Sequence, residues 1–271
     1  MQTLAEMAVE VLTCADGREK TALARRHAAT WVAARAAGAP LSVGRAVPPD
    51  RPARPARPEL LSPRDMPRRR PGTQPGRLAL LHAVAHIELN AVDLHWDIIA
   101  RFSHVPMPLG FVDDWVQAAD EEAKHFNLMC DCLEAQGSHY GALPAHDGMW
   151  RAAEDTATDL MGRLAVVPMV LEARGLDVTP QMIDLFRKAG DVGAVAALET
   201  IYAEEVGHVA YGAKWFHFLC GRHELDPKET FHALVRRYFH GALKPPFNVE
   251  KRAEAGLPPD FYWPLAEGAG T

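Results

Sequence analysis

The chain is poor in cysteine and in long apolar runs, and both shortages limit what it can be. Four cysteines in 271 residues form neither a dense disulfide framework nor a pair of Cys-x-x-Cys zinc motifs. No charge-free run approaches the roughly 18 residues of a membrane-spanning helix, and charged residues interrupt the N-terminal segment where a signal sequence would be apolar. We therefore expect a soluble, cytoplasmic protein with no membrane partner.

The sequence also lacks an excess of positive charge. Lys and Arg number 29 against 35 Asp and Glu, which argues weakly against a generic nucleic-acid binder because phosphate affinity needs clustered cations. An apolar content of 48% is enough for a substantial core, in one large domain or two small ones. Strands of alternating β-branched residues are missing as well, so the predicted fold class is all-α.

Composition divides the chain into four segments. The first segment is rich in helix-forming residues and the second in Pro and Arg. The third has periodic apolar residues, and the fourth is rich in Pro and aromatic residues. Proline is excluded from helix interiors, so the second segment is predicted to be an extended connector. The predicted domains are an N-terminal helical extension (1–39, with helices 2–13 and 17–37), a Pro/Arg-rich connector (40–76), a helical bundle (77–241) and an extended C-terminal tail (242–271).

Four long helices are expected within 77–241. They are ended by proline segments or glycines, including Gly137, Gly175 and Gly221. A short helix is expected to begin at Thr179 and Pro180, and Asp147 is expected to cap the third long helix. The predicted ranges are 77–102, 111–136, 150–174 and 192–220, with a further helix at 227–241. Long helices with short connections are typical of a four-helix bundle.

Four glutamates interrupt the apolar stripes of these helices: Glu88, Glu122, Glu172 and Glu205. An unpaired carboxylate in a bundle core is costly, so such groups are protonated, paired or bound to metal. Because residues three apart share a helix face, Glu122 can act with His125 and Glu205 with His208.

A single inward glutamate precedes each Glu-x-x-His pair at nearly the same interval. At about 1.5 Å rise per residue, a helical hairpin brings Glu88 to the level of Glu122, and the second half repeats this geometry. The predicted metal ligands of one dinuclear site are Glu88, Glu122, His125, Glu172, Glu205 and His208. This set matches the known template of di-iron and di-manganese bundles. A third pair, Glu229 and His232, lacks a preceding inward glutamate and is interpreted as a chance occurrence.

These residues resemble the ferritin-like di-iron carboxylate superfamily, and more closely a bacterial family within it designated domain of unknown function four-five-five. The similar stretches cover most of 76–221 and read HIE at 86–88, EEAKHF at 121–126, YGALPAHDGMW at 140–150, LEARGLDVTP at 171–180 and EEVGHVAYGAKW at 204–215. The resemblance implies a ferritin-like four-helix bundle and a dinuclear centre, and says little about a substrate.

Such a centre favours oxygen chemistry. Two iron ions held by carboxylates, each with one imidazole, leave open positions for dioxygen, and manganese fits the same ligands. The first hypothesis is a di-iron oxidoreductase of the hydroxylase or oxygenase type, acting on a small-molecule substrate and O2 with an electron donor. The alternatives are ferroxidase, iron storage or detoxification without an organic substrate, and a tRNA-modifying hydroxylase. The last rests on family analogy and on the arginines of the connector, which otherwise form a solvated linker. The oligomeric state stays open, with a homodimer among the options.

Five further residues are candidates around the centre. Glu121 and Glu204 are either carboxylate partners of the metal-bound imidazoles across the bundle, or surface residues on the helix flank. His95 lies two turns beyond Glu88 and is either a group behind the ligands or a hydrogen-bonded core histidine. Tyr202 and Tyr211 either shape and redox-couple the pocket as catalytic residues, or belong to the core with a hydroxyl at its edge.

Overall fold

The computed structural model describes residues 2–38, 41–62, 64–67, 69–146 and 148–266. Within these residues the regular structure is helical apart from two isolated β-bridges, which confirms the all-α prediction. The chain divides into two compact units, Met1–Trp150 (unit 1) and Arg151–Thr271 (unit 2). No described helix combines the length and apolarity that crossing a membrane would require.

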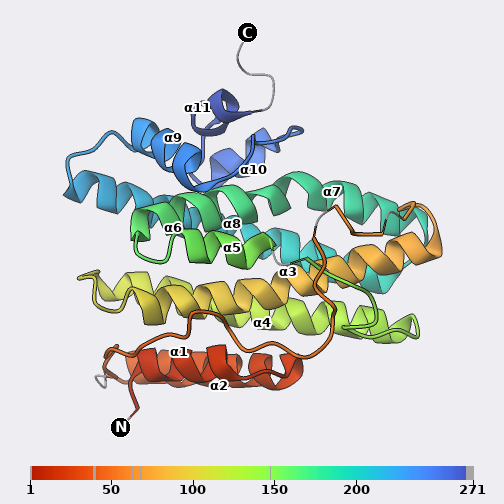
Figure 1. The fold of residues 1–271 in the computed structure, drawn as a ribbon, viewed down its shortest axis with the longest axis horizontal. Coiled ribbons are helices and arrows are strands. Elements are labelled where there is room, and N and C mark those ends of the chain that lie inside the picture. The colour runs from red at the N-terminus through yellow and green to blue at the C-terminus, as the bar shows by residue number, and fades with distance from the viewer. Residues whose placement is uncertain (1, 39–40, 63, 68, 147, 267–271) are drawn as a thin grey trace. The chain divides into compact units, whose positions relative to one another are not determined.

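Unit 1 is built on a hairpin of two long helices, α3 (Gln74–Arg101) and α4 (Leu109–Ala135), which pack side by side (Figure 1). The short connection between them makes them antiparallel neighbours. Thr73 caps α3, its hydroxyl accepting a hydrogen bond from the Gly76 amide. The predicted boundaries, 77–102 and 111–136, differ by no more than a helix turn from these.

The N-terminal helices α1 (Leu4–Thr13) and α2 (Gly17–Ala36) pack on this hairpin and agree closely with the prediction. A cluster of buried charged side chains links α2 to the α3–α4 hairpin. Lys20, fully buried on α2, contacts the Asp93 carboxylate on α3, and Arg54 from the connector lies 3.1 Å from the same carboxylate. Arg54 also donates to Asn90 at 2.8 Å. The connector arginines are therefore not all solvated, although the described part of the connector is mostly irregular, as predicted.

Unit 2 contains most of α5 (Gly148–Asp155). It also contains α6 (Leu160–Val166), the π-helix η1 (Val167–Glu172), α7 (Ala173–Lys188) and α8 (Val192–Arg222). The predicted single helix 150–174 is wrong in two ways. It is interrupted between α5 and α6, and it then continues beyond Gly175 to Lys188. The cap role expected of Asp147 lies outside the described residues. Pro168 lacks the amide that an α-helix needs, and this is where the chain widens into η1.

The predicted helix start at Thr179 and Pro180 is also wrong, since Pro180 lies inside α7. Proline there leaves the carbonyl of Leu176 without its helical donor. Asn248 supplies one instead, because its side-chain amide donates to the Leu176 oxygen at 3.1 Å. A residue far along the chain thus compensates for the proline, which local signals cannot reveal.

The C-terminal part of unit 2 contains α9 (Pro227–Tyr238), α10 (Val249–Glu254), α11 (Pro259–Tyr262) and the 3₁₀ turn η2 (Trp263–Leu265). The tail predicted as extended therefore holds short helices. They pack on α7, α8 and α9, where Phe261 and Tyr262 are buried. Aromatic side chains in the tail thus add to the core of unit 2.

Candidate metal centre

In unit 1 three predicted ligands meet inside the α3–α4 hairpin. Glu88 comes from α3, and Glu122 and His125 come from one face of α4. The Nδ1 atom of His125 lies 3.4 Å from Oε2 of Glu88 and 3.4 Å from Oε2 of Glu122. All three side chains are buried. The hairpin therefore gathers an imidazole nitrogen and two carboxylates around one point.

These separations fit a shared cation better than direct hydrogen bonds. N–H···O bonds cluster near 2.9–3.0 Å, shorter than the distances observed here. Two ligands that each lie about 2.1 Å from one ion are roughly 3.0–3.4 Å apart at octahedral or tetrahedral angles. Carboxylate oxygens with imidazole nitrogen are also the donors that iron, manganese and zinc accept. Unit 1 therefore contains buried acidic and histidine groups that could bind a metal.

The negative charge of the buried carboxylates in this cluster is unfavourable unless a cation compensates it. Burial and, next, the negative charge of Glu122 raise the pKa of Glu88 to about 8, while the nearby His125 ring opposes the shift. The ordinary pKa is 4.5, so the protein environment favours a proton on Glu88 at neutral pH. A bound divalent ion would replace that proton and stabilise the carboxylate.

His95 stands directly behind this cluster. Its Nε2 atom lies 3.7 Å from Oε1 of Glu122, and its ring packs against Trp115 at 5.3 Å between centroids. The side chain is buried. The structure thus places His95 beside a predicted ligand, where it can orient the Glu122 carboxylate.

Unit 2 gathers the remaining predicted ligands. Glu172 ends η1, while Glu205 and His208 lie on one face of α8, and all three are buried. His208 Nδ1 lies 3.8 Å from Glu205 Oε2, and ligand atoms of Glu172 and His208 lie within 4.8 Å of each other. Unit 2 thus repeats the one-Glu plus Glu-x-x-His arrangement of unit 1.

A close approach of two helices fixes Glu172 relative to His208. Helix α8 packs on η1 at Gly212, where a Cβ atom would lie 2.5 Å from Pro168 Cγ and 2.6 Å from Pro168 Cβ. Only glycine leaves room for the proline ring at this distance. Gly212 is one helix turn beyond His208, and Pro168 is one turn before Glu172, so the contact sets the spacing of these two predicted ligands.

The remaining candidate residues, two tyrosines and two glutamates, are half-buried and differ in their contacts. Tyr202 is half-buried and its hydroxyl accepts a hydrogen bond from Asn248 at 2.7 Å, which ties it to the start of α10. Tyr211 is half-buried on the same helix. Glu121 and Glu204 are half-buried, and Glu121 accepts a hydrogen bond from the Gln117 side chain at 3.0 Å. The predicted pairing of Glu121 and Glu204 with the metal-bound imidazoles stays a prediction.

The third Glu-x-x-His pair behaves differently from the other two. Glu229 is exposed in the first turn of α9, and His232 Nε2 contacts backbone carbonyl oxygens of Asp260 and Phe261 at 3.1 and 2.9 Å. The interpretation of this pair as a chance occurrence therefore agrees with its surroundings.

Sequence reasoning did not anticipate the polar network beside Glu88. The His86 ring lies between the Tyr140 hydroxyl, 2.8 Å from Nδ1, and the His146 carbonyl, 3.1 Å from Nε2. Because a carbonyl only accepts, Nε2 carries the proton and Tyr140 donates to Nδ1. His82 Nε2 accepts from the Gly141 amide at 2.9 Å. Burial lowers the pKa of His86 to about 3, so its ring stays neutral and holds the 139–146 loop on α3. The signals in the sequence were the HIE stretch at 86–88 and the YGALPAH motif at 140–146.

Comparison with known proteins places the chain in a family. Residues 13–263 match the family described as "Protein of unknown function (DUF455)". The chain belongs to this family. A protein of Haemophilus influenzae, described as "Uncharacterized protein", is 40% identical over 208 residues, which cover 75% of this chain and 72% of the relative. No solved structure matches the chain.

Proposed function

We propose that this DUF455 member is a dinuclear metalloprotein, with two iron ions as its cofactor, that activates O2 to oxidise a small-molecule substrate. The observation that carries the proposal is the repetition of one donor set in both units. In each, a buried Glu-x-x-His pair meets a third buried glutamate from a neighbouring helical segment. A single Glu-x-x-His pair can be explained by helix structure alone. Two such pairs, each with a third glutamate, match the ligand template of dinuclear helical bundles.

The proposed centre is shared. Three protein donors can also hold a single iron ion, but the four carboxylates and two imidazoles together match the ligand set of a pair of ions bridged by carboxylates. We therefore propose that both three-residue sets belong to one ferritin-like four-helix bundle. The ligands would be Glu88, Glu122, His125, Glu172, Glu205 and His208.

The bound metals would supply the electrons and open coordination positions that O2 requires. The chain would hold the ligands close together in an apolar setting. Its apolar surroundings exclude water and strengthen the attraction of the carboxylates for cations. His95 would orient Glu122 from behind through their 3.7 Å contact. The neutral His86 ring would hold the loop that covers α3 two residues before Glu88.

Iron loading tests the proposal. Anaerobic titration with Fe(II), followed by elemental analysis, should give about two ions per chain for a di-iron site. Glu122→Ala in unit 1 and Glu205→Ala in unit 2 should each remove both ions, because a shared centre needs ligands from both sets. The matched control is Glu229→Ala, which alters the exposed third Glu-x-x-His pair and should leave loading unchanged.

Each outcome decides a different part of the proposal. A stoichiometry of zero or one contradicts the dinuclear site, and loss of one ion in each variant means two separate mononuclear sites. Full loading of a reduced protein that does not consume O2 would refute the oxidoreductase function. Uptake of many ions per chain, in a particle that elutes far above a dimer on gel filtration, would indicate iron storage.

A further inference from the structure

A cavity of about 360 Å³ lies in unit 2, between the η1–α7 segment and the chain that follows α9. Its apolar wall includes Val170, Leu171 and Phe239, and its charged wall includes Arg174, Lys244 and Arg252. None of these residues is a proposed metal ligand. The volume is at the lower end of the roughly 300–1,000 Å³ that small-molecule pockets occupy, so the ligand would be small.

Arg252 is the unusual residue of this wall. Its side chain is 3% exposed, and its Nε and Nη2 atoms donate to the two Asp177 oxygens at 2.8 and 2.7 Å. The rings of Phe247 and Tyr262 pack on its guanidinium at 5.1 and 4.7 Å. The remaining nitrogen, Nη1, is buried and makes no hydrogen bond within the described residues. A buried donor left in this state is unfavourable, so the Asp177 pair alone does not account for the placement of Arg252.

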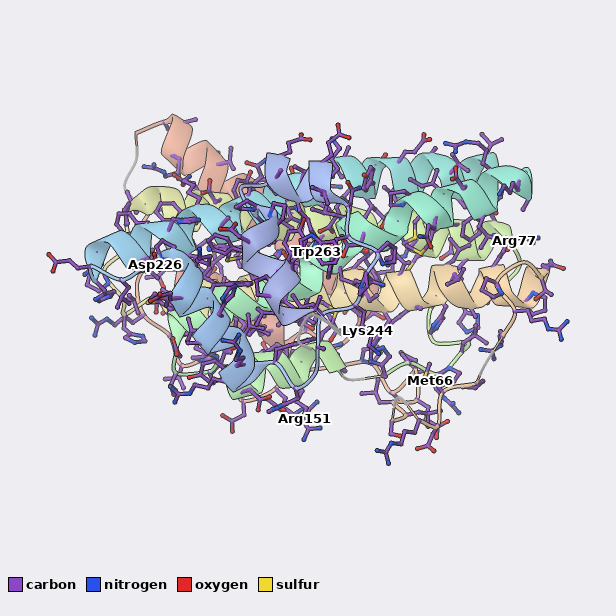
Figure 2. The ribbon with its side chains drawn as sticks, turned by 90° about the horizontal axis from the view of Figure 1, so that it is seen from above. Met66, Arg77, Arg151, Asp226, Lys244 and Trp263 are labelled. Atoms are coloured by element: carbon purple, nitrogen blue, oxygen red, sulfur yellow. The ribbon has the colours of Figure 1, made fainter. Side chains whose placement is uncertain are left out.

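Positive charge predominates around the cavity. Asp177 is the acidic residue of the lining, and it is already engaged by Arg252 and by the Asn248 amide at 2.9 Å. Arg174 donates to the carbonyls of Lys244 and Pro246 at 2.6 and 3.2 Å, and its Nη1 atom lies 3.4 Å from Asp177 Oδ2, so one carboxylate of the lining faces the cations Arg174, Lys244 and Arg252. Lys244 is exposed at the surface of this loop (Figure 2).

We propose that this cavity binds a small organic anion, a carboxylate or a phosphate ester with a short apolar body. The Arg252 guanidinium would attract the anionic head by its charge, and the exposed Lys244 ammonium group would bind it. Val170, Leu171 and Phe239 would cover the apolar part. A purely structural role, in which Arg252 only fastens the C-terminal segment, explains the Asp177 pair. It does not explain the buried Nη1 or the excess of cations around a cavity.

Calorimetric titration of the full-length protein with four six-carbon probes tests this site. Hexanoate and hexyl phosphate carry the anionic heads, while hexylamine and hexanol have the same apolar body. One anion should bind per chain, and the amine and the alcohol should bind at least about tenfold more weakly, a difference of about 1.4 kcal/mol. The stronger of the two anions identifies the head group. The site does not depend on the metal centre, so metal-free protein should give the same result.

Variants locate the binding. Lys244→Glu reverses an exposed charge at the cavity and Ala242→Trp fills the cavity without changing its charge, and each should weaken anion binding at least about tenfold. Lys188→Glu, a charge reversal at the exposed end of α7, is the matched control and should bind like the wild type. Wild-type affinity in both cavity variants, equal binding of hexylamine, or no binding of either anion would each overturn the proposal.

Discussion

Two glycines of α8 allow a direct test of the helix contact that positions the predicted ligands of unit 2. At Gly212 an added methyl group would meet Pro168 at 2.5 Å, whereas at Gly207 it would meet no described atom outside its own helix within 4 Å. The substitutions Gly212→Ala and Gly207→Ala are chemically identical and lie in the same helix. Their comparison therefore isolates the cost of the close approach.

The expected magnitudes follow from two terms. Alanine is better than glycine in a helix interior by about 0.8–1.0 kcal/mol, and both variants gain this amount. Overpacking a well-filled contact costs about 1–3 kcal/mol, and only Gly212→Ala incurs it because the proline ring cannot rotate away. The propensity term cancels in the comparison, so Gly212→Ala should be less stable than Gly207→Ala by about 1–3 kcal/mol.

Thermal unfolding followed by circular dichroism measures this difference. For a chain of this size, each kcal/mol corresponds to about 2–4 °C in Tm. Gly207→Ala should melt at or above the wild-type temperature, and Gly212→Ala should melt below Gly207→Ala. Iron loading should also fall in Gly212→Ala, because the displaced η1 carries Glu172. Equal melting temperatures for the two variants would refute the close contact as the constraint on this helix pair.

Two further predictions concern buried charge in unit 1. Lys20→Met leaves Arg54 as the cation beside the Asp93 carboxylate among the described residues and should cost about 3 kcal/mol in chemical denaturation. The same change at exposed Lys228, 3.6 Å from Asp260, should cost less than about 1 kcal/mol, and equal losses would contradict the role of burial. In metal-free protein, folded Glu88 keeps a proton that the unfolded chain releases, so stability should fall as the pH rises from 4.5 towards about 8. Melting in a chelator should show this decline, Glu88→Gln should flatten it, and an increase in stability over that range would show that the sign is wrong.

Much of the candidate site could be predicted from the sequence because it obeys local periodicity. Glu122 with His125, and Glu205 with His208, share a helix face through their spacing alone, and burial confirms that these faces point inward. The hairpin that returns Glu122 to the level of Glu88 follows from the helical rise and a short connection. These features need no knowledge of distant contacts.

The wrong predictions arise where contacts between residues distant in the sequence override local signals. Gly175 and Pro180 are strong local stop signals, yet α7 continues through both, because the Asn248 side chain replaces the hydrogen bond that Pro180 cannot make. The network of His86 with Tyr140 joins a helix to a loop with no periodic pattern, so spacing rules could not detect it. Tyr202 was predicted to be either a pocket residue or a core residue with its hydroxyl at the edge, and its bond to Asn248 became visible only with the tail in place. Local propensity failed wherever the C-terminal segment or a loop supplied the missing partner.

The π-helix η1 has a consequence for how relatives of this protein are aligned. A π-helix bonds residues five apart instead of four, so it accommodates an added residue within a continuous buried helix without forming a loop. Removing one residue from Val167–Glu172 would restore an ordinary helix while α7 kept its direction. A one-residue gap between Val167 and Leu171, although it falls in a fully helical segment, is therefore admissible when family members are compared. For a relative that lacks this extra residue, an alignment without the gap would pair its glutamate with the wrong position.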